Sequence, residues 1–229
     1  MEGRGTYSKI RAVIFDLDNT LVDFVEAKVK ACRAVVKRIG CGDANELLQY
    51  FLRWRHGFES HENIADYLKD KGVYSDGLYR ECCRIYDKVK LENVKPYPGI
   101  EKVLSNLKQK GIKLAVVTDA ENGHAVERLR KTGLEKFFDV VISADMTGKR
   151  KPEPDSVLLA LDKLGVYAEE SAIVGDSLRR DIEAGKRLGM VTIYAAYGDR
   201  SFFESRKGEA DFVAREPEEI LRVLPKLKI

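Results

Sequence analysis

The 229-residue sequence contains no apolar run of the roughly 18 residues that a membrane-spanning helix requires. Its N-terminal stretch MEGRGTYSKI also lacks the apolar centre of a secretory signal peptide. Basic and acidic residues nearly balance, at 40 and 37, and no block of Lys or Arg provides an electrostatic footprint for nucleic acid. These absences predict a cytoplasmic protein with no membrane partner and no nucleic-acid partner.

Cysteine and histidine are scarce, with four and three residues. The cysteines, at positions 32, 41, 82 and 83, form no CxxC pair, and no histidine lies at zinc-ligand spacing from them. Reduced thiols in a reducing compartment are the expected state, which argues against a disulfide-stapled fold. Glutamine is also rare, at Gln49 and Gln109 alone, whereas 34% of residues are charged, a composition typical of thermophile proteins.

What the sequence does contain is an alternation of short apolar runs with amphipathic segments. Apolar residues reach 44%, enough for a substantial core. Apolar runs too short to be helices, separated by helical periods, predict βαβ units, and right-handed crossovers make these a doubly wound, three-layer α/β domain with a parallel sheet. The predicted strands are 11–16, 113–118, 140–143, 171–175, 191–195 and 211–213, and the helices between them are 100–110, 123–132, 155–164, 178–188 and 217–224.

Residues 23–95 interrupt this rhythm, because they contain no convincing strand. Helical periods run instead through residues 25–39, 47–52, 64–68 and 82–89. The pattern predicts an all-helical domain of about four packed helices, inserted after the first strand. The predicted organisation is therefore an α/β core of residues 1–22 and 96–229 and a helical cap domain of residues 23–95.

Acidic side chains gather where the predicted strands end, which is where ligands bind to parallel sheets. Asp16 ends the first predicted strand and Asp18 comes two residues later, Asp176 follows the fourth strand, and Asp181 comes five residues after Asp176. Four negative charges in one shallow site cost several kcal/mol, or force protonation, unless a cation balances them. A hard divalent cation with oxygen ligands meets this need, and Mg²⁺ fits it best.

Four motifs in this sequence resemble those of the haloacid dehalogenase-type (HAD) hydrolase superfamily, and they occur in the family's order. They are DLDNT at 16–20, Thr118 after LAVV, Lys151 in KPEP, and GDSLRRD at 175–181. The helical insert between the first and second motifs is similar to the cap of the family's first structural subclass. The resemblance implies a Mg²⁺-dependent phosphatase that hydrolyses small phosphomonoesters through an aspartyl phosphate.

The resemblance also implies a catalytic role for each matching residue. Asp16 would be the nucleophile, and Asp18 would serve first as general acid and then as general base. The Thr118 hydroxyl and the Lys151 ammonium would hold the oxygens of the transferring phosphoryl group.

The same resemblance implies a set of metal ligands. Mg²⁺ would be bound by the Asp16 carboxylate, the Asp18 backbone carbonyl and Asp176. Asp181 would act from outside this set, orienting a water on the metal or Lys151.

Asp119 departs from the family's pattern, in which Asn often follows the Ser or Thr of the second motif. A carboxylate directed at phosphate would repel it. We therefore expect this side chain to point away, while the backbone N–H groups of Leu17 and Asp119 bind phosphate. A substrate with a cationic group is the alternative.

Three other activities stay open at this point. A phosphomutase would share every core residue and differ only in how its cap excludes water. A 2-haloacid dehalogenase would use Asp16 but would need neither an acid at Asp18 nor a metal, so Asp18 together with Asp176 favours phosphoryl transfer. A phosphorylation-controlled receiver domain would carry its phosphoacceptor on a later strand, whereas here the first strand carries the whole DLDNT motif.

Substrate choice is less defined by the sequence. The stretch RWRHGFESH (53–61) could contact an anionic or aromatic leaving group through Arg53, Trp54, Arg55, His56 and His61. A solvated face with one core Trp is the simpler interpretation. His124, close to Thr118, is a further candidate contact. The expected partner is a small phosphorylated metabolite, such as phosphoglycolate, a sugar phosphate or a nucleotide; the sequence carries no signal for an oligomeric state.

Overall fold

The computed structural model describes residues 9–53, 55–200 and 210–223, and these divide into two compact units. One unit comprises the described residues up to Asp23 and from Pro96 onward, and the other is Phe24–Lys95. Among the described helices, none is both long enough and apolar enough to cross a lipid bilayer.

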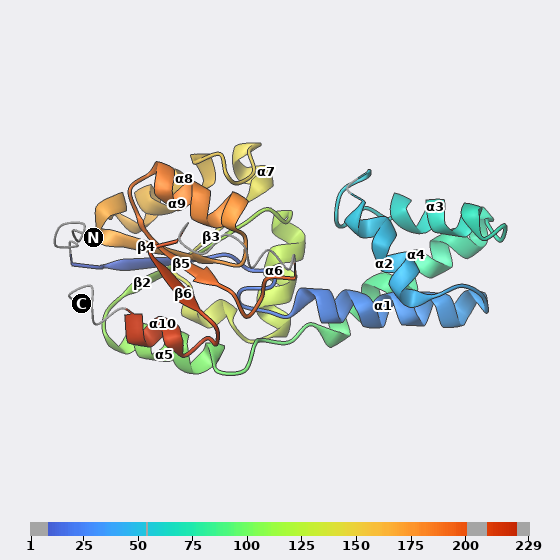
Figure 1. Cartoon of the computed structure of the whole chain (residues 1–229), viewed down its shortest axis with the longest axis horizontal. Coiled ribbons are helices and arrows are strands. Elements are labelled where there is room, and N and C mark those ends of the chain that lie inside the picture. Colours follow the sequence, from blue (N-terminus) through green and yellow to red (C-terminus); the bar gives the residue numbers. More distant parts are fainter. Residues whose placement is uncertain (1–8, 54, 201–209, 224–229) are drawn as a thin grey trace. The chain divides into compact units, whose positions relative to one another are not determined.

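The first unit is built around a six-stranded sheet in which all pairings are parallel (Figure 1). Its order is β3-β2-β1-β4-β5-β6, so the chain moves outward from β1 in one direction and restarts on the other side of β1 with β4. This confirms the predicted doubly wound α/β fold. The strands are β1 (Ala12–Phe15), β2 (Lys113–Thr118), β3 (Val140–Ser143), β4 (Ser171–Gly175), β5 (Val191–Ala195) and β6 (Phe212–Ala214).

Helices cover both faces of this sheet, and its two central strands are completely buried as a result. Figure 1 shows α8 (Asp155–Leu164) and α9 (Glu183–Arg187) on one face, with α5 (Ile100–Gln109) and α10 (Glu219–Val223) on the other. Every residue of β1 and β4 is buried, because a strand covered on both faces has no side for polar residues. The burial of these two strands fixes rigidly the residues that follow them.

The predicted strands 113–118, 140–143, 171–175 and 191–195 and the helix 155–164 have the observed bounds, and the last strand lies one residue later than predicted. The predicted helix over 178–188 is observed as two consecutive helical elements that end one residue earlier. The segment is a π-helical turn, η3 (Leu178–Ile182), followed by α9, and Ile182 N donates to the carbonyl of Ser177, five residues back, at 3.2 Å. The last predicted helix, 217–224, is observed as α10. Residue 224, at the end of the predicted helix, lies outside the described part of the chain.

Several short elements had no counterpart in the sequence pattern. They are α7 (Ala144–Thr147) and the 3₁₀ turns η1 (Glu135–Phe137) and η2 (Ala168–Glu170). Helix α6 (Asn122–Lys131) does have a counterpart, the predicted helix 123–132, and begins and ends one residue earlier. Each of the three short elements is at most four residues long, too short for a hydrophobic period to show.

The second unit consists of four helices, α1 (Phe24–Ile39), α2 (Ala44–Leu52), α3 (Glu62–Asp70) and α4 (Asp76–Asn93). Two of them begin at side-chain caps. The Asp43 carboxylate accepts from the backbone N–H groups of Asn45 and Glu46, and the Ser75 hydroxyl accepts from Leu78 N. A buried cluster with members on all four helices forms the core of this unit.

A lysine lies inside that helical core. Lys28 is completely buried, with its ammonium 3.8 Å from the ring centre of Phe58 and 4.2 Å from that of Phe51. It also donates to the carbonyl oxygen of Phe58. Aromatic faces and a carbonyl oxygen replace part of the hydration that the ammonium loses on burial.

The segments by which the chain leaves the first unit and returns to it are paired. Val22 forms an antiparallel bridge with Pro96, and Tyr97 N donates to the carbonyl of Leu21 at 3.0 Å. The helical unit is therefore inserted between two neighbouring segments of the α/β unit.

Candidate active site

Asp16 extends β1 beyond its last regular residue. Its backbone N–H donates to Val174 O at 2.9 Å, which continues the pairing of β1 with β4. The side chain is buried at the carboxyl end of β1. This strand lies between β2 and β4, where the strand order changes direction. This is the position at which doubly wound sheets bind ligands.

The loop after Asp16 turns back tightly on itself. Leu21 N and Val22 N both donate to the carbonyl of Leu17, and Asn19 adopts a positive φ of 62°. Gly198 packs against this turn, since a Cβ at position 198 would lie 1.5 Å from the Asn19 carbonyl oxygen. Only glycine fits there.

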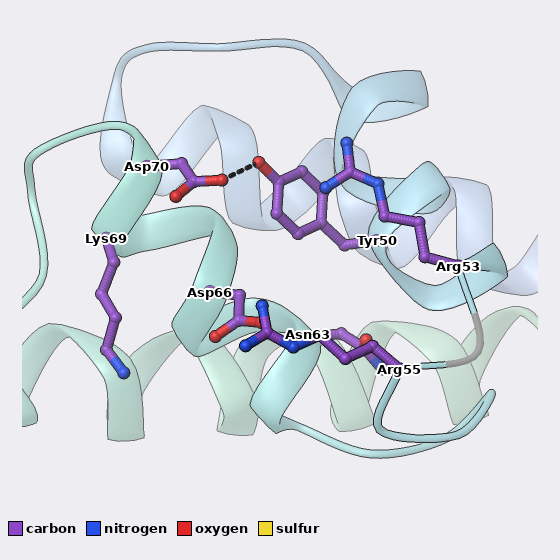
Figure 2. Close-up of a pocket in the computed structure, with 7 residues that line it drawn as sticks. All are labelled: Tyr50, Arg53, Arg55, Asn63, Asp66, Lys69 and Asp70. Atoms are coloured by element: carbon purple, nitrogen blue, oxygen red, sulfur yellow. Dashed lines mark hydrogen bonds and ion pairs between the residues drawn. The ribbon is translucent and has the colours of Figure 1, made fainter.

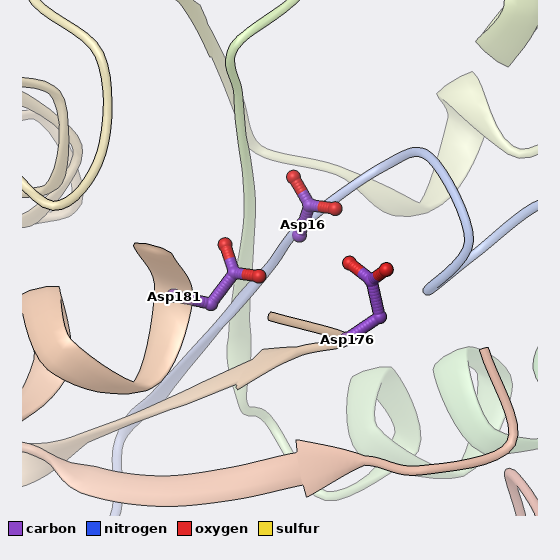
Figure 3. Close-up of side chains that lie close together, drawn as sticks. All are labelled: Asp16, Asp176 and Asp181. Carbon is purple, nitrogen blue, oxygen red and sulfur yellow. The ribbon is translucent and has the colours of Figure 1, made fainter. Parts of the chain in front are cut away.

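Three carboxylates converge at this edge of the sheet. Oxygens of Asp16, Asp176 and Asp181 all lie within 4.8 Å of one another, and all three residues are buried (Figure 3). Asp181 reaches the cluster from the π turn, where its Oδ2 accepts from Ser177 N at 3.0 Å. Gly175 leaves the necessary room, because a Cβ there would lie 2.3 Å from Asp181 Cβ.

Lys151 provides the cation inside this cluster. Its Nζ lies 2.6 Å from Asp16 Oδ1 and 2.6 Å from Asp181 Oδ1, and it donates to Val117 O at 2.9 Å. The side chain is only 1% exposed. Although burial acts against it, the two carboxylates raise the pKa of Lys151, so the ammonium stays charged.

One lysine does not balance three acids. Burial raises the pKa of Asp16 to about 7, against the opposing effect of Lys151. Burial and the carboxylates of Asp16 and Asp181 also raise the pKa of Asp176 well above its ordinary value. Asp176 Oδ1 is buried and accepts no hydrogen bond from the described residues.

This donor set fits a hard divalent cation. Carboxylate oxygens are the ligands that Mg²⁺ prefers, and a bound cation would ionise Asp16 and Asp176 and satisfy the Asp176 oxygen. The cluster that the structure brings together differs from the predicted ligand set in including the Asp181 carboxylate beside Asp16 and Asp176.

Asp18 lies apart from this cluster and faces a different cation. Arg128 Nη1 donates to Asp18 Oδ2 at 2.5 Å, and the arginine side chain is only 4% exposed. Arg128 is on α6, so a helix that follows β2 orients the second carboxylate of the DLDNT motif. The two neighbouring acids therefore have separate partners, Lys151 for Asp16 and Arg128 for Asp18.

Comparison with known proteins identifies the family. A family model described as haloacid dehalogenase-like hydrolase matches residues 13–195. The chain belongs to this family. It is 31% identical to a phosphoglycolate phosphatase of Aquifex aeolicus, over 94% of this chain and 97% of the relative, and 30% identical to a glyceraldehyde 3-phosphate phosphatase of Methanocaldococcus jannaschii, over 96% and 99%.

Solved structures of this family have the same fold. A crystal structure of a candidate β-phosphoglucomutase from Thermotoga maritima superposes with a TM-score of 0.82, at 28% identity, covering 95% of this chain and 100% of that one. A HAD phosphatase from Thermococcus onnurineus superposes with a TM-score of 0.66, at 26% identity, covering 96% and 100%. The predicted membership of the HAD superfamily is thus confirmed.

The remaining core residues of the family motifs lie at the ends of the same strands. Thr118 ends β2 and is buried, and its Oγ1 accepts from Ala120 N at 3.2 Å. Leu17, directly after Asp16, is also buried. The Asp119 carboxylate accepts from the backbone N–H of Lys151 at 3.0 Å and lies 3.4 Å from Arg180 Nη1.

The candidate substrate contacts of this HAD protein stay predictions. His124 is an exposed residue near the start of α6. In the helical unit, the guanidinium of Arg53 lies 4.0 Å from the ring centre of Tyr50, and His56 contacts Asp66 at 2.8 Å and Glu62 at 2.9 Å. Trp54 lies outside the described residues.

A pocket of about 220 Å³ opens in the same helical unit (Figure 2). Arg55 reaches Asp66 at 3.2 Å, and the Tyr50 hydroxyl donates to Asp70 at 2.5 Å. The two acids of this pocket therefore already have partners within the helical unit. The pocket is lined by Tyr50, Arg53, Arg55, Asn63, Asp66, Lys69 and Asp70.

Two arginines of this HAD site were missed from the sequence. Arg128 shares the buried face of α6 with Ala125 and Leu129, and this helical phase is the signal that could have found it. Arg180 immediately precedes Asp181, and its position depends on the π turn, which the sequence pattern did not indicate.

Proposed function

We propose that this HAD protein is a Mg²⁺-dependent phosphatase that hydrolyses small phosphomonoesters through an aspartyl phosphate on Asp16. The observation that carries the proposal is the arrangement of Lys151 between Asp16 and Asp181, beside the buried Asp176. Similarity to phosphatases that act on phosphoglycolate and glyceraldehyde 3-phosphate supports the substrate class.

In the first step, a carboxylate oxygen of Asp16 attacks phosphorus, the ester P–O bond breaks, and Asp18 gives its proton to the leaving oxygen. Lys151 holds the other oxygen of Asp16 and, with the Thr118 hydroxyl, offsets charge on the phosphoryl oxygens. In the second step, Asp18 takes a proton from water, the water oxygen bonds to phosphorus, and the bond to Asp16 breaks. Inorganic phosphate leaves and both carboxyl groups return to their initial states.

Asp16, Asp176 and the carbonyl oxygen of Asp18 would hold Mg²⁺. When bound, the cation supplies positive charge that offsets the charge of the transferring phosphoryl group. Asp181 would keep Lys151 in place, since its carboxylate contacts the same ammonium as Asp16, also at 2.6 Å.

We further propose that Phe24–Lys95 acts as the cap that selects the leaving group, as caps do by excluding water and contacting substrate. Arg53 and His56 are its candidate contacts. Their alanine variants are expected to change KM for some phosphate esters and not others, in a panel that includes phosphoglycolate, glyceraldehyde 3-phosphate, sugar phosphates and nucleotides. Equal effects on every ester would contradict a role in selection.

The hydrolase proposal is tested by phosphate release from a chromogenic phosphate ester. We expect release with Mg²⁺, none after chelation, and a loss of at least about 10³-fold in Asp16→Asn. Asp155→Asn, which changes an exposed carboxylate at the start of α8, is the matched control and should keep full activity. Release that survives Asp16→Asn would sink the proposal.

A phosphomutase is the second candidate, because the T. maritima structure with a TM-score of 0.82 bears that name. A mutase would pass the phosphoryl group from Asp16 to a sugar hydroxyl instead of to water. Product analysis separates the two: an isomeric sugar phosphate indicates a mutase, and free phosphate indicates a phosphatase.

A further inference from the structure

Asp119 and Arg180 form an ion pair at the rim of the acidic cluster. Arg180 Nη1 lies 3.4 Å from Asp119 Oδ2, and its Nη2 lies 3.9 Å from Asp176 Oδ1. The other oxygen of Asp119 accepts the backbone N–H of Lys151 at 3.0 Å. The Asp119 carboxylate, directly after Thr118 of the second motif, thus contacts one residue of each of two other motifs, Lys151 and Arg180.

The π turn gives Arg180 this position. Asp181 N and Ile182 N both donate to the carbonyl of Ser177, at 3.0 and 3.2 Å, so the turn holds one residue more than an α-helical turn. Asp181 still points into the cluster, where Lys151 binds it. The residue before Asp181 is therefore at the rim, with its side chain 37% exposed and its guanidinium facing Asp119.

The charges explain why an arginine is needed there. Asp16, Asp119, Asp176 and Asp181 are four carboxylates, and Lys151 is the buried cation among them. A divalent cation and Lys151 together leave one negative charge, and Arg180 balances it. Without Arg180, the charge of Asp119 would oppose a phosphate dianion held at Thr118 and at the Asp119 backbone N–H.

We propose that Arg180 is a positioning residue that acts through Asp119. By neutralising that carboxylate, it lets Asp119 hold the Lys151 backbone without repelling the phosphate of the substrate. The same engagement of Asp119 argues against a substrate with a cationic group. This inference rests on the proposed phosphatase function, since it assumes a phosphate at the Thr118 end of β2.

The test is a double-mutant cycle on phosphate affinity. Arg180→Met leaves Asp119 uncompensated and should weaken the binding of inorganic phosphate in Mg²⁺ about tenfold, with KM rising in parallel and kcat changing less. Asp119→Asn keeps an oxygen acceptor for Lys151 N–H and should bind phosphate at least as tightly as wild type. The double variant should return to within about twofold of wild type, because both charges are gone.

Calorimetric binding of inorganic phosphate is measured beside turnover, so that the two proposals fail separately. Arg179→Met, at the exposed neighbour in the same turn, is the control and should leave both unchanged. Arg180→Lys should retain most of the affinity because it keeps the charge. A double variant that binds phosphate as weakly as Arg180→Met, with thermal unfolding showing a folded protein, would overturn the inference.

If phosphate binding follows the expected cycle but wild type releases no phosphate from any ester, the arrangement of charges stands and the phosphatase proposal falls. If wild type turns over and Arg180→Met leaves phosphate affinity unchanged, the inference about Arg180 falls alone.

Discussion

Arg128 Nη1 lies 2.5 Å from Asp18 Oδ2, and this contact orients the carboxylate proposed as general acid and base. Replacing Arg128 by Met removes a donor that is only 4% exposed and takes away one contact that orients the carboxylate. We expect kcat to fall about 10- to 100-fold with little change in KM, because proton transfer requires the correct geometry. Steady-state kinetics with a phosphate ester measure both constants.

The control for Arg128 lies on the same helix. Arg130, which pairs with Glu135 and is 68% exposed, should tolerate the change to Met with no loss of rate. An Arg128→Met enzyme that is folded and as fast as wild type would remove Arg128 from the account.

We expect Lys151 to have opposite effects on catalysis and on metal binding. Lys151→Met should lower the rate about 10³-fold, because the transferring phosphoryl group loses a buried positive charge. The same change removes a cation 2.6 Å from Asp16 Oδ1, so Mg²⁺ should bind about tenfold tighter without substrate. Calorimetry with Mg²⁺ and initial rates give the two numbers. Exposed Lys149→Met should change neither, whereas weaker Mg²⁺ binding in Lys151→Met would contradict the account.

The stability of the metal-free protein should depend on pH through Asp16. Its pKa is about 7 in the folded protein against 3.8 for the ordinary group, so the folded state binds this proton more tightly. The stabilisation from Asp16 is therefore complete below a pH of about 4 and is lost as pH rises through about 7. The pKa of Asp176 shifts in the same direction.

Because a bound cation favours the ionised carboxylates, the gain in Tm from Mg²⁺ should grow across this window. Thermal unfolding at several pH values, with Mg²⁺ or with a chelator, measures the gain. Asp176→Asn should reduce both the gain and its pH dependence. A gain in Tm from Mg²⁺ that is the same at both ends of this pH window would count against Asp16 and Asp176 as metal ligands.

Gly198 is a steric test of the loop that carries Asp18. Gly198→Ala places a Cβ against the Asn19 carbonyl and should lower the free energy of unfolding by about 3 kcal/mol and lower kcat. Gly123→Ala is the matched control, because nothing lies within 4 Å of its Cβ and the site is helical. It should be neutral or stabilise by up to about 1 kcal/mol. Chemical denaturation compares the two, and equal stabilities would contradict the close packing at Gly198.

Much of the fold could be read from the sequence because burial leaves a local record. Strands covered on both faces are mostly apolar, so residues 113–118 and 171–175 were predicted with their observed bounds. The acids that follow β1 and β4 converge because parallel strands share one carboxyl edge, which brought Asp16 and Asp176 together.

The partners of the two arginines could not be predicted in this way, because they are distant in the sequence. Arg128 and Asp18 are 110 residues apart, and only the packing of α6 brings them into contact. Arg180 reaches Asp119 because the turn before Asp181 is π-helical, a geometry that hydrophobic periodicity does not encode.

The central claim is that Asp16 forms the covalent bond to phosphorus. Mass spectrometry of enzyme quenched with acid during turnover tests it directly, because an acyl phosphate survives acid long enough to be located on a peptide. We predict one added phosphoryl group on the peptide that contains Asp16, dependent on Mg²⁺ and absent in Asp16→Asn, which should also be inactive. A phosphoryl group on a different residue, or phosphate release that continues at the wild-type rate in Asp16→Asn, would contradict the account.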